Sequence, residues 1–144
     1  MKKLKILLPV DGSKSSLNAA KYVAKLAKDL QSKCTVTLIS VHDDIGLGHV
    51  KEFVSSSVID DYLREVSEKE LRGAQKVLAA AGVKHSMVIK RGNVATEIIT
   101  LANKEKSDMI VMGSKGRSGI LDTVMGSIAQ KVSSNAKQPV LLVK

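Results

Sequence analysis

The stretch LKILLPVDGS, residues 4–13, decides the fold. Its first seven residues, 4–10, form an almost continuous apolar run, which is typical of a strand buried on both faces of a sheet. The residues Asp-Gly-Ser at 11–13 interrupt this run. A helical spacing of apolar residues then begins at Ser15 or Ser16, where a serine is a good N-cap. A buried strand, a sharp break and an amphipathic helix are the first elements of a parallel βαβ unit.

The same alternation continues to the end of the chain. Apolar or β-branched runs predict further strands at residues 35–41, 84–90, 109–112 and 140–143. Spacings of three and four between apolar residues predict further helices at residues 58–81, 95–102 and 128–134. Gly82 ends the longest of these helices, as a C-terminal glycine should. Residues 45–55 contain two glycines and no clear period, so we expect a loop there.

Strands that alternate with helices predict one α/β domain that covers residues 1–144. Parallel strands are joined by right-handed crossovers, which place helices on both faces of the sheet. We therefore expect a doubly wound, Rossmann-like, five-stranded parallel sheet. In such sheets ligands bind beyond the carboxyl ends of the strands, where the strand order reverses. Polar and glycine residues that directly follow a strand are thus the places to search for a site.

Composition limits where the protein works. The chain has 144 residues, of which 44% are hydrophobic, and no apolar run approaches the length of about 20 residues that a membrane span needs. Lys2, Lys3 and Lys5 precede an apolar stretch that covers only residues 6–10, which is too short for the core of a signal peptide. The single cysteine, Cys34, cannot form an internal disulfide, which fits a reducing compartment. We expect a cytoplasmic protein without a membrane partner.

A formal net charge of +9 attracts polyanions but does not choose among them. Aromatic residues make up only 2% of the chain and tryptophan is absent, whereas a single-stranded nucleic-acid platform needs stacking rings. The positive charge is also spread along the sequence rather than gathered in blocks. We therefore interpret it as a solvated, lysine-rich surface and do not expect nucleic acid as the partner.

The segment that carries chemistry is GSKGRSG, residues 113–119, followed by Gly126 and Ser127 at the start of a helix. Glycines let backbone N–H groups approach an anion closely, and a helix N-terminus adds unpaired donors and positive partial charge. Ser127 can offer a hydroxyl, and Lys115 and Arg117 add mobile positive charge. The pattern is neither a Walker A loop nor the dinucleotide pattern G-x-G-x-x-G. It suits a di- or triphosphate.

The spacing of these glycines, G-x2-G-x9-G-S from residue 113 to residue 127, resembles the signature of the universal stress protein family, and most of all its ATP-binding branch. The opening LLPVDGS at 7–13 and the closing PVLLV at 139–143 look like the ends of that family's sequences. The Val41-His42 strand end and the Arg91-Gly92 turn are similar as well. The resemblance covers essentially the whole chain.

This resemblance implies the strand order 3-2-1-4-5 and a homodimer formed through the last strand, Val140–Val143. It implies that Asp11 contacts adenine or ribose, that Val41 presents backbone groups to the adenine edge, and that N–H groups near Ser127 hold the phosphates. The implied nucleotide-binding residues are Pro9, Val10, Asp11, Val41, Met112, Gly113, Gly116, Gly126, Ser127 and Ile128. Further candidates for phosphate contacts are Ser114, Lys115 and Arg117.

The sequence therefore predicts a stress-response protein that binds ATP, or ADP or AMP, with any Mg²⁺ carried by the phosphates. We expect a regulator rather than a catalyst, because no base to position water and no carboxylate dedicated to a metal is evident. No catalytic residue and no protein metal site is predicted, since His42, His49 and His85 share no ligand spacing. Alternative interpretations are a slow ATPase or self-phosphorylating enzyme, and a basic nucleic-acid-binding module. Asp11 could also be a plain helix cap.

Overall fold

The computed structural model describes residues 3–29, 33–43, 52–115 and 125–144. Strands and helices alternate throughout, as the sequence predicts. The elements are β1 (Leu4–Pro9), α1 (Lys14–Asp29), β2 (Cys34–His42), α2 (Ser56–Ala80), β3 (Lys84–Arg91), α3 (Val94–Lys104), β4 (Met109–Gly113), α4 (Ser127–Asn135) and β5 (Val140–Val143). Most of the predicted loop at 45–55 lies outside the described residues.

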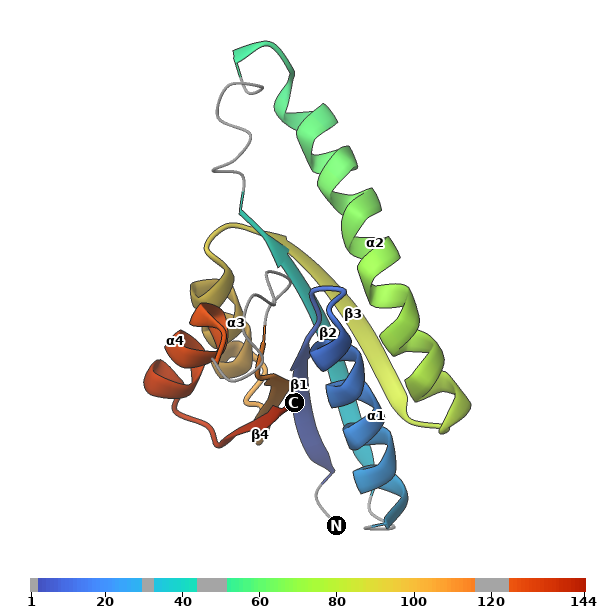
Figure 1. The fold of residues 1–144 in the computed structure, drawn as a ribbon. Coiled ribbons are helices and arrows are strands. Elements are labelled where there is room, and N and C mark those ends of the chain that lie inside the picture. Colours follow the sequence, from blue (N-terminus) through green and yellow to red (C-terminus); the bar gives the residue numbers. More distant parts are fainter. Residues whose placement is uncertain (1–2, 30–32, 44–51, 116–124) are drawn as a thin grey trace.

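All five strands are parallel, in the order β3-β2-β1-β4-β5. Helices α1 and α2 cover one face of this sheet, and α3 and α4 cover the other (Figure 1). The doubly wound fold and the strand order are thus confirmed. The order reverses between β1 and β4, where Leu7 pairs with Ile110. The carboxyl ends of these two strands therefore form the switch point at which a ligand is expected.

Alternation along β1 divides the core into two layers. Ile6 and Leu8 pack with the residues of α1 and α2, whereas Leu7 packs with those of α3 and α4. Leu7 and Leu8 are fully buried, and burying one such side chain is worth about 1.5–3 kcal/mol. Because both faces are apolar, the strand reads as a continuous hydrophobic run in the sequence.

Three of the four helices are capped at their N-termini by side chains. Ser13 precedes α1, Ser55 precedes α2 and Asn93 precedes α3, and each accepts a hydrogen bond from a first-turn amide at 3.2, 3.4 and 3.0 Å respectively. The N-cap of α4 is Gly126, which has no side chain to do this. The first-turn amides of α4 are therefore left without the partner that the other helices supply.

Helices α2 and α3 end in the same way but with different residues. After α2, Gly82 adopts a left-handed conformation with φ 70°, and the amide of Val83 donates to Leu78 O at 3.0 Å. After α3, Lys106 occupies the equivalent place with φ 54°. A residue with a Cβ pays about 1–2 kcal/mol for this conformation, which glycine adopts freely.

Within the part of the chain that the structure describes, no helix combines the length and the apolar character that a membrane crossing requires.

Candidate functional site

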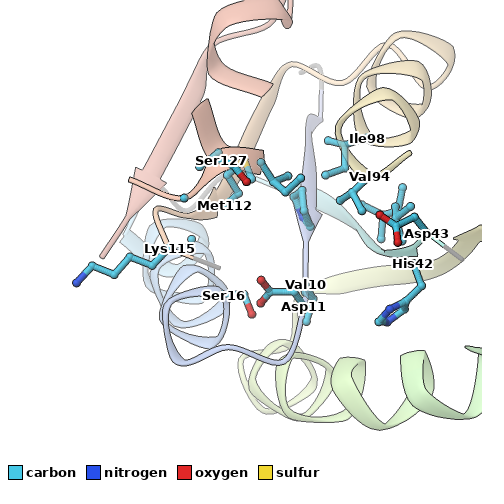
Figure 2. A pocket seen from close by; sticks show the side chains of 17 residues that line it. Val10, Asp11, Ser16, His42, Asp43, Val94, Ile98, Met112, Lys115 and Ser127 are labelled. Carbon is cyan, nitrogen blue, oxygen red and sulfur yellow. The ribbon is translucent and has the colours of Figure 1, made fainter. Parts of the chain in front are cut away.

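A cavity of about 350 Å³ lies at the carboxyl edge of the sheet, at the switch point between β1 and β4. Figure 2 shows it from close by, with side chains reaching it from both layers of helices. Its lining residues are Pro9, Val10, Asp11, Ser16, Ile39, Val41, His42, Asp43, Val94, Ile98, Met112, Gly113, Lys115, Gly126, Ser127, Ile128 and Ala129. The volume lies within the range of ordinary small-molecule sites.

Asp11 supplies a carboxylate to this cavity. One of its oxygens, Oδ1, accepts a hydrogen bond from the amide of Ser13 at 2.9 Å, which holds the turn between β1 and α1. Ser13 itself caps the helix through its hydroxyl. Asp11 is therefore not the cap of α1, and Figure 2 shows its carboxylate on the cavity side, next to Ser16.

The N-terminus of α4 forms the opposite side of the cavity. The amide of Gly126 donates to Ser114 O at 2.7 Å, so it is committed within the chain. This differs from the expectation that the amide faces phosphate. The amides of Ser127 and Ile128 donate to no acceptor among the described residues, and both residues line the cavity. With the partial positive charge of the helix end, this arrangement is chemically suited to an anion.

Gly113 at the end of β4 has a packing role that the sequence does not reveal. A Cβ built on it would lie 2.7 Å from the backbone of both Ser15 and Ser16 and would also collide with the Ser15 hydroxyl. Only glycine allows the first turn of α1 to approach β4 this closely. The contact is fixed by the Ser15 hydroxyl, which donates to Lys115 O at 2.8 Å and accepts from Lys115 N at 3.2 Å.

The remaining wall is apolar. Ile39 and Val41 of β2 lie on one side, and Val94 and Ile98 of α3 face them, as Figure 2 shows for the residues of α3. Met112 of β4 closes the slot. This wall can accept a flat apolar group such as a base. The contribution of α3 could not be found from the sequence, because its apolar spacing is the same as that of a core-facing helix.

His42 lies at the rim of the cavity, and its side chain turns toward α2 (Figure 2). Its Nε2 lies 3.1 Å from Oε2 of Glu70, whose side chain is only 4% exposed. When Glu70 is ionised it can only accept, and the hydrogen then lies on Nε2. Two hydroxyls, those of Ser40 and Ser67, are also buried and make no hydrogen bond among the described residues.

The structure brings most of the predicted residues together. Nine of them lie within its description and line the cavity: Pro9, Val10, Asp11, Val41, Met112, Gly113, Gly126, Ser127 and Ile128. Gly116 and Arg117 lie outside the described residues.

The three candidates for further phosphate contacts, Ser114, Lys115 and Arg117, differ in where they lie. Lys115 lines the cavity, but its side chain extends away from it in Figure 2. Ser114 is absent from the lining; its amide donates to Val143 O at 2.7 Å and its carbonyl accepts from Gly126. Among the described residues, no three histidine, cysteine or acidic side chains gather in a way that could hold a metal ion.

The fold and the cavity together define a class: a doubly wound α/β domain with a ligand cavity at its carboxyl edge. The sequence profile of the universal stress protein family matches residues 4–144. The chain therefore belongs to the universal stress protein family.

The universal stress protein MJ0531 of Methanocaldococcus jannaschii is 35% identical to this chain over 141 residues, which are 97% of this chain and 81% of the relative. The solved structure of MJ0577, also from M. jannaschii, superimposes with a TM-score of 0.86 at 29% identity and covers 100% of this chain and 97% of that one.

Two more distant members of the fold were solved with ligands. A universal stress protein in complex with cAMP has a TM-score of 0.70 at 23% identity, with 98% and 97% of the two chains covered. A universal stress protein of Archaeoglobus fulgidus in complex with dAMP has a TM-score of 0.65 at 20% identity, with 100% of both chains covered. At these identities the likeness shows the fold alone.

Proposed function

We propose that this protein binds an adenine nucleotide, ATP in the first place, in the cavity between β1 and β4, and acts as a nucleotide-dependent regulator in a stress response. One observation carries the proposal: α4 begins at the cavity with a glycine N-cap, while the other three helices are capped by side chains. An uncapped helix N-terminus facing a cavity is suited to a phosphate group.

The rest of the cavity fits the other parts of a nucleotide. The apolar slot between β2 and α3 would accept the base, with Val41 and Ile98 on its two sides. The carboxylate of Asp11 would accept hydrogen bonds from ribose hydroxyls. Ser127 would add a hydroxyl to the amides that hold the phosphates. Any Mg²⁺ would be carried by the phosphates and water, since the residues that line the cavity supply only the carboxylates of Asp11 and Asp43.

A regulator works through the difference in affinity that its two states have for the ligand or the partner.

We further propose that the chain is cytoplasmic and forms a homodimer through β5. That strand lies at the edge of the sheet, and its four residues, Val140–Val143, are all only partly buried. An apolar edge strand of this kind is a template for pairing with a second copy.

The test begins with the ligand itself. Mass spectrometry of what denatured, freshly purified protein releases should find an adenine nucleotide. Calorimetric titration of ligand-free protein should then show binding of ATP, ADP or AMP. Release of no nucleotide, together with no heat from any of the three, would refute the proposal.

A variant at Asp11 tests the pose. Asp11→Asn keeps an oxygen for the Ser13 amide but removes the charge, and hydrogen bonds to charged groups are worth about 1.5–3 kcal/mol. We expect affinity to fall about 10- to 100-fold, while Asp61→Asn on the exposed face of α2 leaves it unchanged. In single-turnover experiments a regulator returns ATP intact, and hydrolysis that Asp11→Asn abolishes would favour the enzyme alternative.

A further inference from the structure

The fold gathers lysines that the sequence spreads out. At the amino-terminal edge of the sheet, opposite the edge with the nucleotide cavity, two cavities of about 400 and 370 Å³ each have four lysines in their lining. These lysines are Lys3, Lys5, Lys28, Lys33, Lys84, Lys104 and Lys106. They are brought together because the amino ends of parallel strands and the carboxyl ends of the connecting helices meet at one edge.

The larger cavity, here called the basic cavity, has an excess of positive charge in its lining. Lys5, Lys84, Lys104 and Lys106 line it, against the single carboxylate of Glu105 in its lining. Within the described part of the chain, none of these four ammonium groups forms an ion pair with a carboxylate. Lys84 also lines the smaller cavity, so the two cavities share one of their lysines.

The lining of the basic cavity includes hydroxyl groups beside the apolar side chains of Ile6 and Val36. Thr37 of β2 and Ser86 of β3 are direct partners in the sheet register, and both line the cavity together with Ser107. Hydroxyls at these positions supply hydrogen-bond donors to an anion held by the lysines.

Lys106 gives an independent indication. It stands at the left-handed position after α3, with φ 54°, where α2 uses Gly82. The chain therefore keeps a strained backbone at a place where glycine would relieve it, and the residue kept there contributes a positive charge to the basic cavity. Strain of this kind is commonly retained for function.

We propose that the basic cavity binds a chain of phosphate groups that carries no base, with inorganic triphosphate as the simplest example. Lysine ammonium groups are compact point charges that suit phosphate oxygens from several directions. No phenylalanine, tyrosine or tryptophan lines either cavity, and the imidazole of His85, which lines the basic cavity, is tied through Nδ1 to Val83 O at 2.9 Å. The site is separate from the nucleotide cavity and does not depend on what that cavity binds.

The experiment is a titration of the isotope-labelled protein with inorganic triphosphate at low salt. Binding is monitored through the NMR chemical shifts of the backbone amides. We expect shifts at Thr35, Lys84 and Ser107 and saturation at one equivalent. Removing one exposed charge should weaken binding by up to about fivefold. The double variant Lys84→Gln/Lys106→Asn, which removes two, should therefore weaken it about tenfold or more. Asparagine tolerates the left-handed backbone, so the variant keeps the fold.

The control variant Lys21→Gln/Lys69→Gln removes the same charge from exposed helix faces that line neither cavity, and it should bind as the parent does. Equal losses in both variants would mean general surface charge and would overturn the proposal. Shifts confined to Gly113 and Ser127 would do so too, because the anion would then occupy the nucleotide cavity. Tighter binding of a single-stranded RNA of equal charge at the same amides would refute the claim of a chain without bases.

Discussion

Replacing Gly126 with aspartate should make the protein more stable and a worse nucleotide binder at the same time. Gly126 has φ −63° and ψ 150°, the extended conformation that Ser55 and Asn93 adopt at the N-caps of α2 and α3. An aspartate can therefore take the same conformation without strain. Its carboxylate would accept from the first-turn amide of Ala129, which is the bond that α4 lacks.

The two effects have opposite signs and can be sized separately. Replacing glycine with a side-chain cap is worth a few tenths of a kcal/mol, and a negative charge at a helix N-terminus adds about 0.3–1 kcal/mol. A total of about 1 kcal/mol raises the melting temperature by about 2–4 °C in a chain of this size. For a phosphate charge about 5 Å from the new carboxylate, an effective dielectric of about 20 gives a repulsion of about 3 kcal/mol, or roughly 100-fold in affinity.

The assay is a pair of measurements on each variant: thermal unfolding without ligand, and calorimetric titration with ATP. Gly126→Asn separates the cap from the charge, because it should stabilise α4 with a much smaller loss of affinity. Ser55→Asp places the same charge at the N-cap of α2 and should leave ATP binding unchanged. A Gly126→Asp protein that is more stable and still binds ATP as the parent does would refute the assignment of phosphate to α4.

Four further outcomes follow from the packing. Gly113→Ala should lower the free energy of unfolding by about 1–3 kcal/mol in chemical denaturation, because the new Cβ collides with the backbone of α1; an unchanged midpoint would contradict this. Gly73→Ala, in the exposed middle of α2, should instead raise it by about 0.5–1 kcal/mol, since the new Cβ meets only one side-chain atom at 3.4 Å. Ser67→Ala should also raise it, by about 1 kcal/mol, by removing a buried hydroxyl that has no partner among the described residues; a loss of stability would reveal a partner for it. Burial raises the pKa of the Cys34 thiol. The contribution of this thiol to the free energy of unfolding is therefore fully present at neutral pH and falls at alkaline pH, where the thiol of the unfolded chain ionises first. Thiol reagents should modify the native protein far more slowly than the denatured one.

The order of elements could be predicted because both faces of the sheet are buried. That burial turns β1 into an apolar run, and it leaves Asp11 and Gly113 as visible breaks after their strands. The rule that ligands bind at the switch point then places these breaks at one edge of the sheet. Most of the cavity could therefore be located from one sequence.

Three features could not be predicted, each for a physical reason. Val94 and Ile98 line the cavity, but a helix residue that faces a cavity has the same periodicity as one that faces the core. Glu70 pairs with His42 across 28 residues, and no local pattern encodes such a contact. The amide of Gly126 donates to Ser114 O, and no local pattern encodes a backbone contact between residues so far apart in the sequence.

The bond between Ser114 O and Gly126 N has a practical consequence. The chain leaves the sheet after β4 at Ser114 and enters α4 at Gly126, and the two atoms are only 2.7 Å apart. This single clamp holds the end of β4 against the start of α4, so these two walls of the cavity keep their spacing. Protein engineers can therefore treat β4 and α4 as one scaffold and retune what the cavity accepts through the side chains that line it.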